Sequence, residues 1–258
     1  VQREGKYNYP LYSDSYGKGA LQVQNGVSTK AGITYALTGR HLLQLNVGYF
    51  NTPQSLRNIY PNVRNSNRIL PNLKNEMAYA AYASYILRSS FLKGRLTGFF
   101  TEIENTAETN FFYTETALTD EIDKDFVAQT IDGIKKRHFG LELGAEAQLH
   151  PTVKLTAAAA IGQYTYINNP SLYISAGDVN KAIDEVKMKN YHVPSGPQQA
   201  YSLGLEYRNP KYWWVGATAN FLAQNYVSLS ALNRTSQFFI DPATKAPYSN
   251  IDLDKARQ

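Results

Sequence analysis

Apolar and polar residues alternate at every second position over much of this sequence, and this pattern restricts the fold more than any other feature. In FGLELGAEAQL (139–149), Phe139 and Leu141 share one face, whereas Glu142 and Glu146 share the other. A period of two is that of a β-strand with one apolar and one polar side. Similar alternation, blurred in the third and fourth cases, predicts seven further strands at 27–38, 41–50, 76–88, 92–104, 153–166, 200–208 and 212–224.

One stretch, DVNKAIDEVKMKN (178–190), fits two structures. Val179, Ile183 and Val186 have the spacing of an amphipathic helix. Val186 and Met188 instead alternate with polar residues as in a strand, and we favour the strand.

The connections between the predicted strands differ in length in a regular order. The short ones are Gly39-Arg40, 89–91, 150–152 and 209–211. The long ones are 51–75, 105–138 and 167–199. Because short and long connections alternate along an antiparallel chain, all short turns are expected at the same end. This sorting is typical of outer-membrane barrels, which have short periplasmic turns and long extracellular loops.

Aromatic residues gather near both ends of the predicted strands. Those beside the short turns are Tyr35, Tyr85, Tyr207, Tyr212 and Trp213, and those toward the long loops are Tyr49, Phe99, Tyr164, Phe221 and Tyr226. Two aromatic girdles around a band of Ala, Leu and Val fit a lipid-facing surface, because amphipathic rings prefer the membrane interface. The alternative is a β-sandwich with these rings in its core, where the sorted loops would be a coincidence. The sequence therefore predicts an all-β fold, a transmembrane antiparallel β-barrel.

Small residues recur on the polar face, which is expected to line the lumen. An eight-stranded barrel is narrow and filled by its own side chains, so these small residues predict about eight strands of a larger barrel. We expect 1–258 to be part of one such domain, with polar ends and with no signal peptide, plug domain or closing strand. The residues expected to face lipid are Leu143, Ala145, Val215, Ala217 and Ala219, and those expected to face the lumen are Glu142, Glu146 and Asn220.

Composition excludes several other classes of protein. The absence of Cys excludes disulfide scaffolds, thiol nucleophiles and Cys-ligated metals. A net charge of +5 without clustered aromatic and arginine residues argues against nucleic-acid binding. The apolar run from Met77 to Leu87 is too short for a membrane helix. The 4 His are scattered, so we expect no metal site, catalytic residue or cofactor.

Four segments carry a more specific pattern. In STKAGITYALTGRHLLQLNVGYFNTPQSLRNIYPN (28–62), two strands and a tight turn lead to Phe50 and Pro53 before a long loop. LPNLKNEMAYAAYASY (70–85) contains a Pro-x-Leu-Lys-x-Glu entry into a strand. These features resemble the barrel of TonB-dependent outer-membrane receptors. HFGLELGAEAQL and YHVPSGPQQAYSLGLEYRNPKYWWVGATANF (191–221) are similar to barrel strands of such receptors from the Bacteroidetes lineage.

The resemblance implies a plugged outer-membrane barrel of about 22 strands, to which this chain contributes strands from the C-terminal half. It implies a receptor that binds a scarce, bulky ligand (a siderophore, glycan or peptide) at extracellular loops and imports it with energy from the inner membrane. The implied partners are the TonB energy-coupling protein, acting through a plug, a surface lipoprotein lid, and outer-membrane lipid and lipopolysaccharide. The alternatives are a docking barrel, a passive channel or a barrel hydrolase. For the hydrolase, His138 near Glu142 is the one candidate catalytic pair in the sequence.

Two loop regions differ in charge. Nine acids and one base lie between Glu102 and Asp132, a net charge of −8, which fits a solvated loop or a vestibule that attracts cations. We favour the solvated loop. Loop 51–75 instead mixes Arg, Asn and Tyr, which suits hydrogen bonding to a polar ligand. The candidate ligand-binding residues are Arg57, Tyr60, Arg64, Arg68, Tyr164 and Tyr166.

Overall fold

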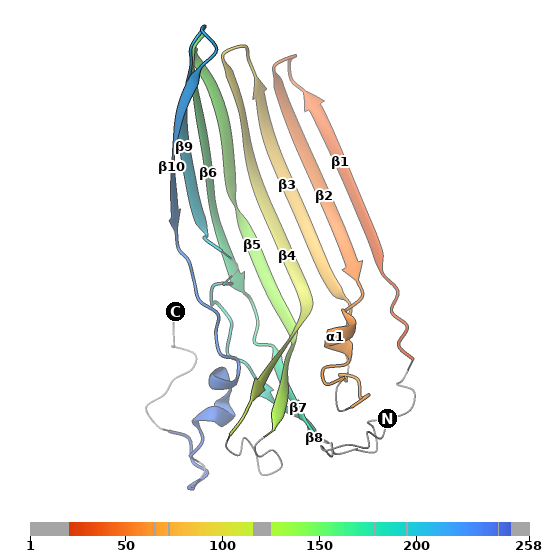
Figure 1. The fold of residues 1–258 in the computed structure, drawn as a ribbon. Coiled ribbons are helices and arrows are strands. Elements are labelled where there is room, and N and C mark those ends of the chain that lie inside the picture. The colour runs from red at the N-terminus through yellow and green to blue at the C-terminus, as the bar shows by residue number, and fades with distance from the viewer. Residues whose placement is uncertain are drawn as a thin grey trace, which may run out of the picture.

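A computed structural model describes residues 21–63, 66–71, 73–115, 125–177, 179–194, 196–241 and 243–248. In these residues one antiparallel sheet contains 10 strands, and eight of them follow one another as β1-β2-β3-β4-β5-β6-β9-β10 (Figure 1). The eight are β1 (Val27–Ala36), β2 (His41–Thr52), β3 (Glu76–Arg88), β4 (Leu92–Tyr113), β5 (Phe126–His150), β6 (Val153–Tyr166), β9 (Gln199–Arg208) and β10 (Trp214–Ala223). The prediction of about eight antiparallel barrel strands is confirmed.

The remaining elements lie at one end of this sheet. Strands β7 (Ser171–Ala176) and β8 (Val179–Glu185) form a hairpin that pairs with β5. The helical turns are α1 (Leu56–Ile59), η1 (Leu232–Arg234) and η2 (Ser236–Phe239). No helix in the described part of the chain is long and apolar enough to cross a membrane.

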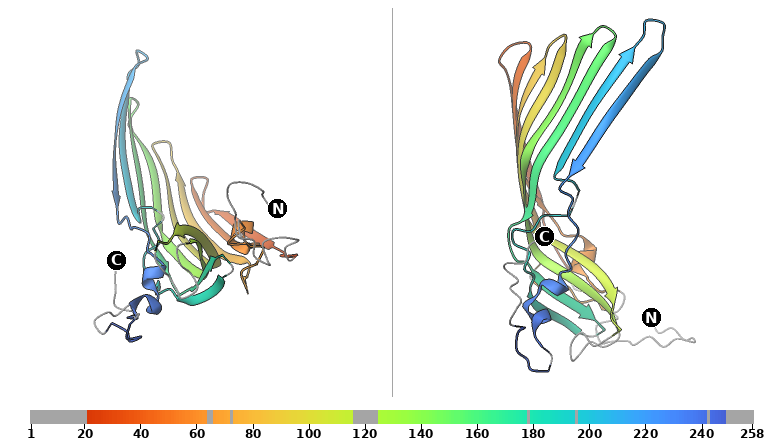
Figure 2. Two further views of the ribbon diagram at one scale, coloured as in Figure 1. Left: turned by 60° about the horizontal axis from the view of Figure 1, so that its bottom comes forward. Right: turned by 90° about the vertical axis from the view of Figure 1, so that its left-hand side faces the viewer.

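The sheet is curved and open. It bends into a trough, and β1 and β10 are its two edges (Figure 2). The turns of the four main hairpins, β1–β2, β3–β4, β5–β6 and β9–β10, all lie at the same end, which we call the turn end (Figure 1). The long connections lie at the other end, the loop end. The predicted sorting of short and long connections is therefore confirmed.

Cross-strand register places the apolar residues of every barrel strand on one face. Leu143 lies opposite Leu96 on β4 and Ala159 on β6, while Leu205 lies opposite Ala217. These side chains are open to the surroundings, with Leu143 43% and Val215 58% exposed. Such a continuous apolar surface belongs in lipid rather than water. The predicted lipid-facing and lumen-facing residues accordingly occupy opposite faces of the sheet.

Two aromatic residues assigned to the outer girdle instead face the lumen. Phe99 lies opposite Gly140, and a Cβ on that glycine would come within 2.9 Å of the Phe99 ring. Tyr164 covers Gly162 in the same way, and its ring lies 6.3 Å from that of Phe99. The girdle prediction was wrong for this pair because each ring fills the space left by a glycine on the lumen face.

The predicted long connection 105–138 is mostly strand. Strand β4 continues to Tyr113 and β5 begins at Phe126. The register shifts between Ile103 and Thr106 and again before Glu108, where Asn105 and Gly133 have positive φ angles of 58° and 75°. Each bulge inserts one residue and breaks the period of two. The recognised pattern of β4 therefore ended at its bulge, whereas that of β5 began only at Phe139, six residues after Gly133.

From Val179 onward, the stretch 178–190 is a strand followed by an irregular segment. Strand β8 ends at Glu185, so the helix alternative is wrong and the predicted strand lies further toward the N-terminus than expected. Val186 and Met188 are buried beyond the strand, at 0% and 5% exposure. They belong to a hydrophobic core at the loop end, formed by Ile131, Ile134, Tyr166, Leu172, Val186, Met188, Tyr191, Val193 and Ala231. This core joins β5, β6, β7 and the segment after β10 into one packed unit.

We predict that the two faces of β10 respond differently to a new charge. Ala217→Arg places the charge on the lipid face and should cost about 2–4 kcal/mol of folding free energy near the membrane midplane. Asn220→Arg places it on the lumen face and should have a small effect. Urea unfolding of the complete protein in liposomes measures both, and equal losses would contradict the face assignment.

Candidate functional site

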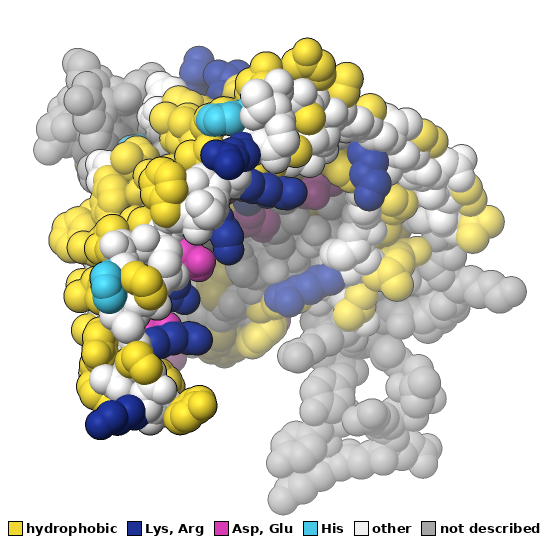
Figure 3. All heavy atoms as spheres, turned by 90° about the horizontal axis from the view of Figure 1, so that it is seen from above, with side chains coloured by type: hydrophobic (Ala, Val, Ile, Leu, Met, Phe, Trp, Pro, Cys, Tyr) yellow, Lys and Arg dark blue, Asp and Glu magenta, His cyan; other side chains and the backbone are white. Residues whose placement is uncertain are grey.

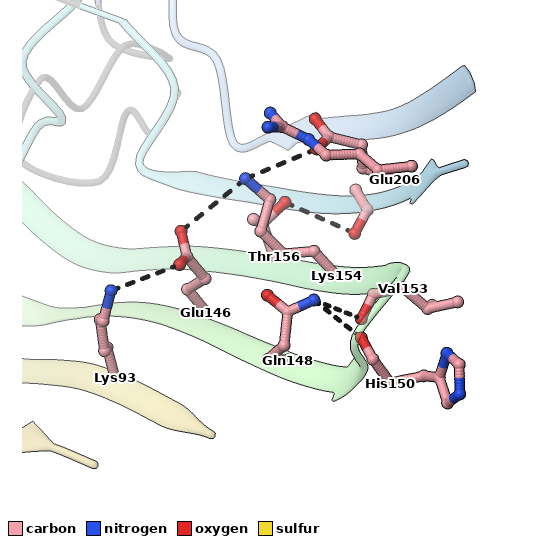
Figure 4. A network of polar contacts seen from close by, with 10 residues as sticks. Lys93, Glu146, Gln148, His150, Val153, Lys154, Thr156 and Glu206 are labelled. Carbon is pink, nitrogen blue, oxygen red and sulfur yellow. Dashed lines mark hydrogen bonds and ion pairs between the residues drawn. The ribbon is translucent and has the colours of Figure 1, made fainter. Parts of the chain in front are cut away.

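The lumen face near the turn end carries a row of charged side chains, here called the charge ladder (Lys93, Glu146, Lys154, Glu206 and Arg208). The Lys154 Nζ atom lies 4.0 Å from a Glu146 oxygen and 3.9 Å from a Glu206 oxygen. The Lys93 Nζ atom lies 3.8 Å from the other Glu146 oxygen, and Arg208 donates to Glu206. Figure 4 shows Lys154 between the two carboxylates.

The charge ladder is a consequence of register. Lys93 lies directly opposite Glu146, and Lys154 lies directly opposite Glu206. Opposite charges at such positions attract one another across adjacent strands. Of these residues, sequence analysis assigned only Glu146 to the lumen. The signal for Lys93 was present, because it alternates with Leu92 and Gly94, but the blurred pattern of that strand concealed it.

Basic residues outnumber acidic ones on this part of the wall. Among the described lumen-facing residues near the short turns, the bases are Arg88, Lys93, Arg95, Lys154 and Arg208, and the acids are Glu146 and Glu206. Seen from the turn end, Lys and Arg side chains gather around the hollow, while hydrophobic side chains cover the outer side (Figure 3). The described part of the lumen wall is therefore positively charged near the turn end.

A second candidate region lies in the loop between β2 and β3. Pro53, Leu56, Ile59, Tyr60 and Val63 line a groove of about 790 Å³. The other lining residues are Leu21, Gln22, Gln24, Gln54, Ser66 and Asn67. The groove combines aliphatic side chains with neutral amides, so it suits an uncharged or amphipathic group rather than a strongly charged one.

Polar side chains attach this loop to β4. Gln54 is buried and donates to the carbonyl oxygens of Lys74, at 3.0 Å, and of Asn105. Asn58 donates to the Ala107 carbonyl at 2.6 Å and accepts from the Thr109 hydroxyl at 3.2 Å. Amide groups that bond to the backbone in this way hold a loop in one position, because breaking the bonds leaves polar atoms unpaired.

The loop candidates occupy different surroundings. Arg57 is exposed, and its guanidinium lies 5.2 Å from the centre of the Phe111 ring. Tyr60 lines the groove, whereas Arg68 is exposed outside its lining. Arg64 lies outside the described residues. Tyr60 is therefore the one candidate from this loop that the described structure places in a concave surface.

Tyr164 and Tyr166 lie apart from that groove, on β6. Tyr164 is on the lumen wall, with its ring 4.9 Å from that of His138. Tyr166 is 5% exposed in the loop-end core, and burial together with the nearby Glu108 raises its pKa to about 12. Tyr166 is therefore a packing residue, and the structure does not bring the sequence candidates together into one site.

Three acids of the acidic stretch are paired with bases that come after it in the chain. Lys135 lies 3.2 Å from Glu104, Lys136 lies 2.6 Å from Glu108, and Arg137 lies 3.0 Å from Glu102. The hairpin of β4 and β5 brings these groups opposite one another. The net charge of −8 was counted only as far as Asp132, so the count did not include the three cations that lie directly across the hairpin. Asp120, Glu121 and Asp123 lie outside the described residues.

Among the described residues, no group of three or more His, Asp or Glu side chains is arranged to hold a metal ion. His192 stacks on Tyr226 with ring centres 4.0 Å apart, and its Nδ1 lies 3.1 Å from the side-chain oxygen of Gln198. His41 contacts Tyr85, and His150 contacts Thr152. The described imidazoles are thus engaged in separate local contacts.

An apolar outer face, a polar lumen face and hairpins sorted by length define a section of a transmembrane β-barrel. A family model described as "TonB dependent receptor-like, beta-barrel" matches residues 4–254, so the chain belongs to this family. The resemblance noted in the sequence is confirmed, and with it location in the outer membrane. The family consists of receptors rather than enzymes, which confirms the expectation of no catalytic activity. The finer likeness to Bacteroidetes receptors stays a prediction.

One solved structure has a similar fold. Copper transporter OprC aligns with a TM-score of 0.50 and 16% sequence identity, over 80% of this chain and 28% of that chain. This chain thus spans less than a third of the transporter that it matches. No curated protein matches the sequence.

We predict that Lys154 contributes more to stability than Lys93. Lys154 contacts both acids of the charge ladder and is 28% exposed, whereas Lys93 contacts one acid and is 68% exposed. Lys154→Gln should cost about 1 kcal/mol, and the control Lys93→Gln a few tenths, because exposed pairs contribute little. Urea unfolding of the complete protein at low and high salt checks this, and the ranking fails if Lys93→Gln costs as much.

Proposed function

We propose that the chain is the barrel section of an energy-coupled outer-membrane receptor, which captures a scarce, bulky ligand at its extracellular loops and imports it. The loop end would then be the extracellular side and the turn end the periplasmic side. The observation that carries the proposal is the packed structure at the loop end, which a passive pore does not need.

That structure connects parts of the chain that are far apart in sequence. The segment after β10 returns to the loop between β8 and β9, where the Lys187 N–H donates to the Arg234 carbonyl at 2.9 Å. The Arg234 guanidinium also lies 4.5 Å from the centre of the Tyr191 ring. Ordering such segments costs about 1–2 kcal/mol of backbone entropy per residue, so their retention supports a binding task.

The loop assembly is joined to the lumen wall. Gln198 is buried, and its side-chain amide donates to the Tyr164 carbonyl at 3.0 Å. Its side-chain oxygen also contacts His192 of the neighbouring loop segment. A ligand-induced shift of this loop would therefore act directly on β6, the kind of connection that a receptor requires between capture and passage.

The ligand class is proposed at the level of siderophores, glycans and peptides. The neutral groove beside Tyr60 and the paired acids of β4 indicate no need for a strongly charged ligand at the described loop surface. The printed name of OprC refers to copper. Soft copper ions prefer thiolate and thioether ligands, and this chain has no Cys and 2 Met, so nothing in this barrel section supports copper as the cargo.

The domain arrangement and the partners belong to the same proposal. We propose that residues 1–258 are one part of a barrel domain, whose edges β1 and β10 pair with further strands in the complete protein, since open edges do not persist in lipid. We further propose that TonB acts on the complete protein through a plug and that a surface lipoprotein covers the loop end. Lipopolysaccharide would contact the apolar outer face.

Energy coupling is tested by measuring uptake of the ligand by cells that express the complete protein. We expect uptake to stop when an uncoupler collapses the proton gradient, while binding at the cell surface continues. Continued uptake without the gradient would replace this proposal with a passive channel. Loss of both binding and uptake would leave a docking barrel as the better description.

We predict that Asn58→Ala detaches the β2–β3 loop without unfolding the barrel. The substitution leaves the Ala107 carbonyl without its side-chain donor and removes one of the two partners of the Thr109 hydroxyl, which costs about 1–3 kcal/mol locally. Limited proteolysis should cut 53–75 faster, and ligand binding should weaken by about tenfold or more. The exposed Asn110 on β4 provides the control, Asn110→Ala. Equal proteolysis of both variants would contradict the anchoring role.

A further inference from the structure

Arg95 is a lumen-facing arginine that neutral groups hold in place. Its Nε atom donates to the Thr97 hydroxyl at 3.2 Å, and its Nη2 atom donates to Ser84 at 3.1 Å and to Gln44 at 3.4 Å. Ser84 and Thr97 are buried and share a hydrogen bond of 2.9 Å. The guanidinium is therefore fixed across β2, β3 and β4 by three uncharged side chains.

The charge of Arg95 is not balanced within the described wall. The ion pairs of this region join Lys93, Lys154 and Arg208 to Glu146 and Glu206, and none includes Arg95. Glu142 lies on the same face but forms no ion pair with it. An arginine has five N–H donors, and the Nη1 group of Arg95 has no partner among the described residues.

The wall beside Arg95 leaves room for an incoming group. Gly144 lies directly opposite on β5, and a Cβ placed there would meet no atom within 4 Å. Ala158 and Ser202 continue this row of small side chains on β6 and β9. Lys93, two positions along the same face, is 68% exposed and adds positive potential.

We propose that Arg95 is the centre of a carboxylate-binding site on the lumen wall. A fixed guanidinium loses little entropy on binding, and its planar donors match a carboxylate better than a flexible ammonium does. The carboxylate comes either from an Asp or Glu of a polypeptide segment in the lumen or from a small acidic molecule that passes through it. The site depends on the chemistry of the wall alone and stands whether or not import is energised.

The test uses the complete protein in detergent and the variant Arg95→Lys, which keeps the positive charge and supplies an amine. A carbodiimide then joins that amine to any carboxylate held against it, and peptide mass spectrometry identifies the product. An amide bond to an Asp or Glu outside residues 84–208 shows the polypeptide source. A citrate adduct at residue 95, formed when citrate is added, shows the small-molecule source.

The matched control is Arg40→Lys, in the exposed turn between β1 and β2. We expect the yield at residue 95 to exceed that at residue 40 by roughly tenfold, the ratio expected from one hydrogen bond between charged groups. A product formed only with Glu142 or Glu146 would overturn the proposal, because the wall would then balance its own charge. Equal yields at residues 95 and 40 would also overturn it. Retained heat-modifiable migration on gels confirms that both variants are folded.

Discussion

The need to pair every backbone N–H and C=O group inside a bilayer governs this structure. No water is available there to replace a missing partner, so strands cross a membrane only as a continuous hydrogen-bonded sheet. The backbone hydrogen bonds between neighbouring strands run without a break from β1 to β10 in the described residues. In a sheet bonded in this way, successive side chains must point alternately to lipid and lumen. The apolar band, the charge ladder and the setting of Arg95 all result from that alternation.

The same strands serve two environments, and two bulges mark the change. Within the barrel, β4 and β5 keep strict register, but at Asn105 and Gly133 each strand gains one residue. Beyond the bulges, β5 pairs with β7 as well as β4, and Ile131 enters the loop-end core. The bulges therefore allow membrane strands to continue into a packed loop assembly without a flexible connection.

Charge is distributed by the same geometry. Across the β4–β5 hairpin, Glu102, Glu104 and Glu108 meet three cations and are neutralised. Near the turn end the pairing is incomplete, because the wall has more bases than acids. The loop end is thus suited to binding neutral or amphipathic groups, and the turn end is suited to binding acidic groups. This division links the proposed capture of a ligand at one end with the carboxylate site proposed at the other.

The sequence by itself determined the class of fold, the number of barrel strands, the sorting of the turns and the two faces, because these depend on a local period of two and on turn residues. It could not determine how a strand continues past a bulge, so β4 beyond Asn105 and residues 126–138 of β5 were missed. The girdle assignment also put Phe99 and Tyr164 on the lipid face, because it followed their distance from the loops rather than their alternation, and the structure shows that each ring covers a lumen-face glycine. Tertiary structure likewise decided which distant charges pair with each other. It also left Arg95 without an acidic partner in the described wall and placed Tyr60 apart from Tyr166. Those properties depend on which strands become neighbours, and a linear pattern does not contain that information.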